Sequence, residues 1–142
     1  MLKYNLETEI EKPLDQVIRL FTNRSLLPKW QPGLVSDEIQ ISQEDLKTYK
    51  LTYQVGRRKL SMTETITCEV RNQYNATYKL KGVVNHVRHH FESIDALRTT
   101  WRSEQEFRFK GLMKLISLFM RSGFENQSRM IMNNFKQFAE KQ

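Results

Sequence analysis

The chain has 142 residues, a length typical of one domain with a substantial core. Apolar residues make up 39% of it and charged residues 27%, which excludes a disordered chain and a largely membrane-embedded one. Lys and Arg number 23 against 16 acidic residues, so the formal net charge is +7 and an anionic partner must be considered. The single cysteine, Cys68, excludes an intrachain disulfide and a cysteine-rich zinc site. We expect one ligand-binding domain over residues 1–142.

The beginning of the chain carries no sign of export. Residues 1–7 alternate between apolar and polar types and lack the apolar core of a secretory signal. No segment reaches the roughly 20 consecutive apolar residues of a transmembrane helix. We therefore expect a cytoplasmic protein.

The first predicted elements are a strand and two short helices. Residues 2–10 alternate with a period of two, which predicts a half-buried strand. Pro13 suits the first turn of a helix, and apolar residues follow it at helical spacing up to Phe21. A second short helix or turn is predicted over residues 24–30, before Pro32-Gly33 ends it.

The rest of the chain divides into strands and one long helix. Residues 34–110 show alternating apolar residues between short turns, the pattern of an antiparallel meander of about six strands. After Gly111 the apolar period changes to 3.6, which predicts a helix over residues 112–139. Gly123 marks a place where this helix can bend or approach another element closely.

Residues 112–120 are unusual because they are apolar on nearly every side of the predicted helix. A helix that is apolar on all sides is normally buried by other parts of a protein, by a partner or by a membrane. We favour a role in covering the mouth of a cavity, while a dimer interface and a membrane-contacting surface remain open. Lys110, Lys114 and Arg121 flank the segment and suit an anionic surface.

Three stretches in this order resemble a known family. They are residues 10–17 with Phe21 and Leu27-Pro28-Lys29-Trp30-Gln31-Pro32-Gly33, then residues 97–107, then residues 134–140. Together they resemble the START-related, polyketide cyclase/dehydrase-like superfamily (SRPBCC), which includes the birch-pollen-allergen-like proteins. The resemblance covers nearly the whole chain. It implies an α+β helix-grip fold, with a curved seven-stranded antiparallel sheet around a long C-terminal helix and two short helices after the first strand.

The same resemblance implies a cavity for a small hydrophobic molecule, such as a lipid, quinone or polyketide-like compound, which the protein binds, transports or sequesters. No cofactor is implied. The ligand-binding residues predicted from the inward faces are Phe21 and Trp30 at the entrance, Tyr49, Tyr53, Met62, Phe91 and Trp101 as walls, and Glu64, His89 and Gln105 as polar anchors.

Two alternatives remain open, so enzymatic activity is undecided. The first is a polyketide cyclase or dehydratase in which Glu64 or His89 acts as acid or base, because a carboxyl group in an apolar cavity can exchange protons near neutrality. His89 would then be a proton shuttle for Glu64. The second is a protein-interaction module of the same fold.

A metal site and a nucleic-acid site are not expected. His86 and His90 share a strand face but lie about 13 Å apart, too far to bind one zinc ion, and His89 points the other way. The basic turn at residues 56–59 lacks the interleaved aromatic residues of an RNA-binding sheet. We interpret the basic residues behind the net charge as part of a solvated surface. A nucleic-acid partner is therefore not expected, while a transient membrane contact remains open. The protein is expected to be a monomer or a homodimer.

Overall fold

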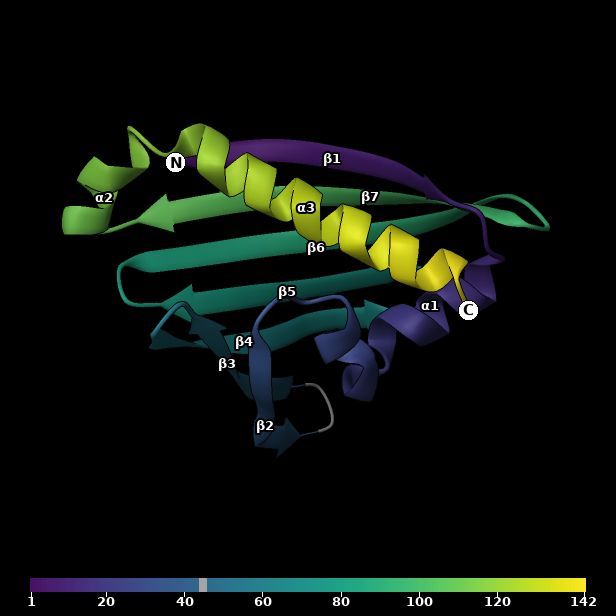
Figure 1. Cartoon of the computed structure of the whole chain (residues 1–142), viewed down its shortest axis with the longest axis horizontal. Coiled ribbons are helices and arrows are strands. Elements are labelled where there is room, and N and C mark those ends of the chain that lie inside the picture. The colour runs from purple at the N-terminus through teal and green to yellow at the C-terminus, as the bar shows by residue number, and fades with distance from the viewer. Residues whose placement is uncertain (44–45) are drawn as a thin grey trace.

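A seven-stranded antiparallel sheet is the main element of the computed structural model, which describes residues 1–43 and 46–142 (Figure 1). The strand order is β1-β7-β6-β5-β4-β3-β2, so β2 to β7 form a meander and β1 pairs with the last strand. The strands are β1 (Leu2–Ile10), β2 (Leu34–Gln43), β3 (Leu46–Val55), β4 (Arg58–Val70), β5 (Gln73–Leu80), β6 (Val83–Asp95) and β7 (Arg98–Phe109). The predicted meander and the helix-grip fold class are confirmed.

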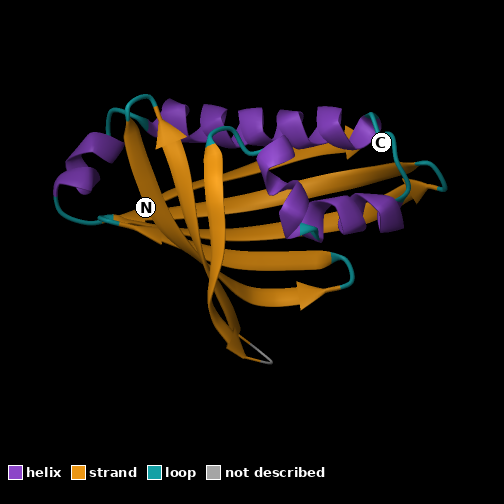
Figure 2. Cartoon of the chain, turned by 60° about the horizontal axis from the view of Figure 1, so that its bottom comes forward, coloured by secondary structure: helices purple, strands orange, loops and turns teal. Residues whose placement is uncertain are grey.

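The sheet curves because its longest strands contain irregularities. The pairing of β4 with β5 shifts between Ile66 and Cys68, and that of β6 with β7 shifts between Ser93 and Asp95. Such bulges bend a strand and increase its twist. Figure 2 shows the resulting sheet with the helices along one of its faces. The inward side chains alternate with exposed ones, as the period of two predicts.

Four helices accompany the sheet, and none that the structure describes is both long and apolar enough to cross a membrane. They are α1 (Leu14–Thr22), the 3-10 helix η1 (Arg24–Lys29), α2 (Leu112–Ser117) and α3 (Arg121–Glu140). In α3 the buried residues are Met132, Phe135 and Ala139, whose spacing of three and four puts them on the face toward the sheet. At the other end of α3, the Tyr4 hydroxyl of β1 donates a hydrogen bond to the Phe124 carbonyl oxygen.

The predicted long C-terminal helix is present as α3, but the helical region of residues 112–139 is not continuous. The helix is interrupted at residues 118–120, where Met120 has φ −118° and ψ 18°, and not at Gly123. The chain leaves β7 at the end of the sheet, and α3 must run back along the sheet, so it has to change direction between them. In Figure 1, α2 projects beyond the end of β7. Periodicity did not reveal this bend because residues 112–120 are apolar on nearly every side.

The predicted role of residues 112–120 as a cover for the cavity mouth is also wrong for most of them. Phe119 is 83% exposed and Leu118 is 74% exposed. Met113 of α2 is partly buried, because it packs against the cluster of Leu2, Val83 and Phe107. The helix lies past the end of the sheet, where little of its surface can be buried.

Aromatic rings form the centre of the core. Phe21 of α1 packs against six other rings at centroid distances of 5.1 to 5.5 Å. These rings belong to Trp30, Tyr74, His89, Phe91, Trp101 and Phe135. Aromatic pairs favour edge-to-face or offset contacts, and five of these six are edge-to-face. The cluster ties α1 and α3 to the sheet.

Candidate functional site

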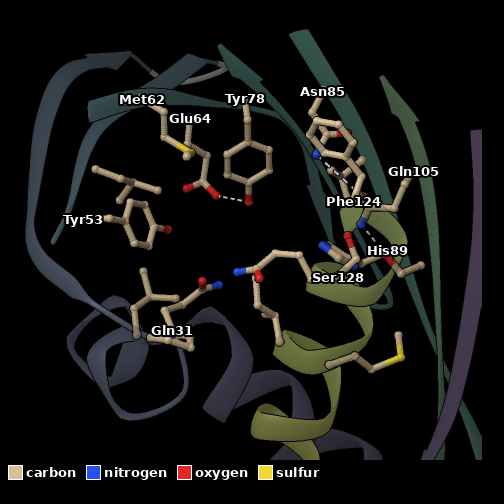
Figure 3. Close-up of a pocket in the computed structure, with 18 of the residues that line it drawn as sticks. Gln31, Tyr53, Met62, Glu64, Tyr78, Asn85, His89, Gln105, Phe124 and Ser128 are labelled. Atoms are coloured by element: carbon tan, nitrogen blue, oxygen red, sulfur yellow. Dashed lines mark hydrogen bonds between the residues drawn. The ribbon is translucent and has the colours of Figure 1, made fainter. Parts of the chain in front are cut away.

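A cavity of about 430 Å³ lies between the sheet and helices α1, η1 and α3. Its wall is mainly apolar, with side chains from strands β3 to β7 and from all four helices. Four of the lining residues are exposed and mark its opening: Pro32, Val55, Leu60 and Gln127. The mouth is therefore bordered by the loop after η1, by the β3–β4 hairpin and by α3. Figure 3 shows the polar side chains that face this space.

Eight of the ten predicted ligand-binding residues line the cavity. They are Phe21, Trp30, Tyr53, Met62, Glu64, His89, Trp101 and Gln105. Phe21 and Trp30 do not lie at the entrance, because both are buried in the aromatic cluster. They form an inner wall instead.

Tyr49 and Phe91 do not line the cavity, contrary to the prediction. The ring of Tyr49 lies under the Arg24 guanidinium group, 3.5 Å from its carbon to the ring centroid. Phe91 is 2% exposed and stacks on Trp101 behind the cavity wall. Alternation placed both residues on the inward face but could not tell which of them another side chain covers.

Arg24 is the centre of a partly buried charge cluster. Its Nε and Nη2 donate hydrogen bonds of 2.8 and 2.9 Å to the two carboxylate oxygens of Asp37. Its Nη1 donates a hydrogen bond of 2.6 Å to Glu64 Oε1. The hydroxyl of Tyr78 donates to the other oxygen of Glu64, as Figure 3 shows. One cation thus pairs with two carboxylates from different strands, an arrangement for which the planar guanidinium group is well suited.

The cluster controls the protonation of its members. Burial alone would favour a neutral Arg24, but hydrogen bonding to Asp37 and the charge of Glu64 outweigh it and raise the pKa of Arg24. Burial, together with the Glu64 charge, raises the pKa of Tyr78 well above its usual value. Tyr78 therefore stays a neutral hydrogen-bond donor, and Arg24 stays a cation.

His89 is also held in one protonation state and one tautomer. The indole Nε1 of Trp101 donates a hydrogen bond of 3.1 Å to His89 Nδ1. An indole N–H can only donate, so Nδ1 accepts and the proton of the neutral imidazole is on Nε2. Burial lowers the pKa of His89 from 6.5 to about 3. At neutral pH His89 is therefore an uncharged ring that keeps one N–H donor for a partner in the cavity.

A row of polar side chains crosses β6 and β7 beside His89. Asn85 Nδ2 donates to Gln105 Oε1 at 3.1 Å, and Gln105 Nε2 donates to Ser103 Oγ at 2.8 Å. Ser103 lies opposite His89 in the strand register. Gln105 is thus held in one orientation by two neighbours.

The suggested proton relay between Glu64 and His89 is not present among the described residues. Both oxygens of Glu64 are hydrogen-bonded, to Arg24 and to Tyr78. The Nδ1 of His89 is bonded to Trp101. The two side chains line the same cavity with separate partners.

Comparison with known families agrees with the fold. Residues 10–136 match the family model described as polyketide cyclase / dehydrase and lipid transport. The chain belongs to this family. No curated protein sequence matches it significantly.

Solved structures similar to this member of the family share its fold at low sequence identity. The Zhui aromatase/cyclase from Streptomyces sp. R1128 is 14% identical with a TM-score of 0.77, covering 97% of this chain and 93% of its own. A conserved protein from Geobacillus kaustophilus is 18% identical with a TM-score of 0.76, covering 99% and 96%. Ara h 8.0201 is 14% identical with a TM-score of 0.79, covering 99% and 98%. At these identities the comparison shows the helix-grip fold alone.

Among the polar residues of the site in this polyketide cyclase/dehydrase family member that were not predicted from the sequence are Arg24, Asp37, Tyr78 and Asn85. Tyr78 and Asn85 lie on predicted strands, and Tyr78 shares the inward parity of Leu80, so alternation could have identified it. Asp37 interrupts the alternation of Val35, Ile39 and Ile41 in its predicted strand, whereas Arg24 gave no such signal. Only the packing of η1 against β2 brings the two charges together.

Proposed function

We propose that the protein binds a small, mainly apolar molecule in the cavity between the sheet and α3. The observation that carries this proposal is the open volume of about 430 Å³ in a mainly apolar wall. Ligand cavities of proteins commonly measure about 300 to 1,000 Å³ and combine apolar walls with a few fixed polar groups. A lipid, quinone or polyketide-like compound matches this description.

Two neutral donors define the polar part of the ligand. The Nε2–H of His89 and the hydroxyl of Tyr53 belong to cavity-lining residues and form no hydrogen bond with the described residues. In Figure 3 the Tyr53 hydroxyl points into the cavity. Burial raises the pKa of Tyr53, so this hydroxyl keeps its proton. We therefore propose a ligand with a carbonyl or other hydrogen-bond-accepting oxygen.

The enzymatic alternative is less well supported by this geometry. A general acid or base must exchange its proton near the working pH. The pKa of His89 is about 3, and Glu64 has both oxygens bonded to Arg24 and Tyr78. The interaction-module alternative expects a filled core, whereas this cavity is open. Binding is thus the function that these residues support best.

Quenching of tryptophan fluorescence by menadione, a small naphthoquinone with two carbonyl oxygens, tests the proposal. Trp30 and Trp101 both line the cavity, so a bound quinone should quench them saturably. Val87→Phe fills part of the cavity and should abolish saturation. Val70→Phe is the matched control, because Val70 is exposed and does not line the cavity.

The polar part of the proposal has its own pair of variants. Tyr53→Phe should weaken menadione binding about fivefold, the effect of losing one hydrogen bond of about 1 kcal/mol. Tyr49→Phe should leave it unchanged, because Tyr49 lies outside the cavity. Unsaturable quenching that is equal in Val87→Phe and Val70→Phe would contradict the cavity as the binding site. If binding in the cavity is found, native mass spectrometry of protein purified from its own host gives the mass of the natural ligand.

A further inference from the structure

The most exposed apolar surface of the molecule lies on α2 and the bend that follows it. We call this surface the α2 patch; its residues are Leu112, Leu115, Leu118, Phe119 and Met120. These five large apolar side chains lie within nine residues, and each is at least 51% exposed. Contiguous apolar areas on a protein surface mark sites of interaction with a partner or a membrane.

The strand register brings basic residues to the same end of the sheet as the α2 patch. Val55 pairs with Arg58 at the β3–β4 turn, Leu80 pairs with Val83 at the β5–β6 turn, and Val83 pairs with Phe109 before α2. The three segments 57–59, 79–81 and 110–121 contain three, two and three Lys or Arg, and no acidic residue. We call these eight side chains the basic end. They are Arg57, Arg58, Lys59, Lys79, Lys81, Lys110, Lys114 and Arg121, and all are exposed.

Within the part of the chain that the structure describes, none of the eight side chains of the basic end forms an ion pair. Eight of the other fifteen Lys and Arg residues form ion pairs in the described part of the chain. At the opposite end of the sheet, Arg98 pairs with Asp95 and Arg71 pairs with Asp15. Outside the eight residues of the basic end the chain has 15 Lys and Arg against 16 Asp and Glu, so the net charge of +7 comes from the end of the sheet that carries the α2 patch.

The basic end adjoins the cavity mouth. The exposed cavity-lining residues Val55 and Leu60 flank the basic turn of the β3–β4 hairpin. Met113 of α2 lines the same cavity. Neighbouring strands lie about 4.8 Å apart, so the three strand spacings from β7 to β4 cover roughly 14 Å. A flat partner can thus contact α2 and the hairpin together.

We propose that this end of the molecule docks on an anionic lipid bilayer. The α2 patch enters the interfacial region, and the basic end contacts the headgroups. An apolar helix with flanking Lys and Arg gains free energy from both contacts. This proposal does not depend on the identity of the cavity ligand.

The chemistry favours a bilayer over the other partners. A second copy in a symmetric dimer would place eight unpaired cations against eight others, and like charges at short distance repel. Nucleic acid would satisfy the cations but would leave the Leu and Met side chains of the patch without an apolar partner. An anionic bilayer satisfies both.

Vesicle flotation with the full chain tests the proposal. We expect the protein to float with phosphatidylcholine vesicles that contain about one third phosphatidylglycerol, and to remain unbound with phosphatidylcholine alone. Binding should fall steeply at roughly 0.5 M salt, where the Debye length is shorter than the spacing of the charges.

Paired variants test the apolar contribution. Phe119→Ser should reduce the affinity for anionic vesicles about tenfold, from the loss of one buried ring. Leu97→Ser is the control, because Leu97 is 70% exposed in the β6–β7 turn at the opposite end. Leu97→Ser should bind like the unaltered protein. Equal affinities of the two variants would overturn a docking role for the patch.

Paired triple variants test the charges. Replacement of Lys110, Lys114 and Arg121 by Gln should weaken binding on the order of 100-fold, at about 1 kcal/mol for each charge near the surface. The same replacement at Arg19, Arg71 and Lys141, which lie away from the basic end, should change it little. All six residues are exposed, and circular dichroism verifies that each variant is folded.

Three further results would overturn the proposal. The first is equal binding to neutral and anionic vesicles. The second is equal weakening by the two triple variants. The third is a dimer at low salt that Phe119→Ser dissociates, which would assign the patch to a second copy of the chain. Replacement of Arg57, Arg58 and Lys59 by Gln tests the contribution of charge to vesicle binding independently, because the β3–β4 hairpin lies outside the α2 patch.

Discussion

His89 shows how one buried side chain links stability to pH. Its pKa is about 3 in the folded protein and 6.5 when it is unperturbed. Between these values the unfolded chain binds a proton that the folded protein does not. The free energy of unfolding therefore decreases as the pH falls from 6.5 toward 3.

Urea unfolding at pH 7 and pH 5 measures this effect. When the pH falls from 7 to 5, the free energy of unfolding of the unaltered protein should decrease by about 2 kcal/mol more than that of His89→Gln. Glutamine keeps an oxygen that can accept from Trp101 but does not titrate. The control is His90→Gln, at an exposed neighbouring position, which should keep the full loss. A loss that is the same in all three proteins would show that His89 does not control this dependence.

Glu64 has a structural role in addition to its place in the cavity. Glu64 is 4% exposed and pairs with Arg24, whose side chain is largely buried. Removing one partner of a buried pair commonly lowers the free energy of unfolding by about 3 kcal/mol or more. We expect this loss for Glu64→Ala, and less for Glu64→Gln, which keeps one acceptor oxygen for Arg24 or Tyr78. Glu104→Ala is the control at an exposed ion pair and should change stability by less than about 0.5 kcal/mol.

At the level of elements, the turn between β5 and β6 positions α2. Gly82 has φ +79°, and a Cβ atom there would lie 2.8 Å from Met113 Cγ of α2. The backbone N–H of Lys110 also donates to the Gly82 carbonyl oxygen. The absence of a side chain at Gly82 thus allows α2 to approach the sheet.

Two glycine substitutions distinguish the effect of backbone strain on stability from the effect of the close approach between Gly82 and Met113. Gly56→Ala at the β3–β4 turn should lower the free energy of unfolding by about 1 kcal/mol, because φ is +61° and no atom lies within 4 Å. Gly82→Ala carries the same strain and in addition displaces Met113. Chemical denaturation should therefore show a larger loss for Gly82→Ala, and hydrogen exchange should become faster in α2. Equal losses and unchanged exchange in α2 would mean that this contact does not hold the helix.

Prediction of the elements from the sequence was accurate where a pattern is local. Alternation depends on neighbouring residues in one strand, so β1 and the meander followed from it. The break at residues 118–120 depends on where the sheet ends, which no local pattern records.

At the scale of the whole molecule, the separation of charge controls self-association. The basic end repels a second copy at low salt, while the α2 patch attracts it once the charges are screened. Sedimentation velocity should find a monomer at low ionic strength and weak association at roughly 1 M salt. Phe119→Ser should remove that association. Association that decreases with salt would show that oppositely charged surfaces, rather than the patch, hold the copies together.

The sequence by itself determined the order of the elements and most of the inward-facing residues, because parity and helical spacing are properties of short segments. The fold class followed from the resemblance of three stretches of the sequence to a known family. The single domain, the cytoplasmic location and the ligand stay predictions. Only the tertiary structure decided which polar groups meet, since Arg24 binds Asp37 and Glu64, which lie 13 and 40 residues further along the chain.

The tertiary structure also decided the meaning of the net charge of +7. In the sequence the basic residues looked dispersed over a solvated surface. Antiparallel pairing brings alternate turns to the same end of the sheet, so segments 57–59, 79–81 and 110–121 gather there beside the cavity mouth. The physical reason is that a charge acts through its distance in space, and that distance is set by the strand register and not by position along the chain.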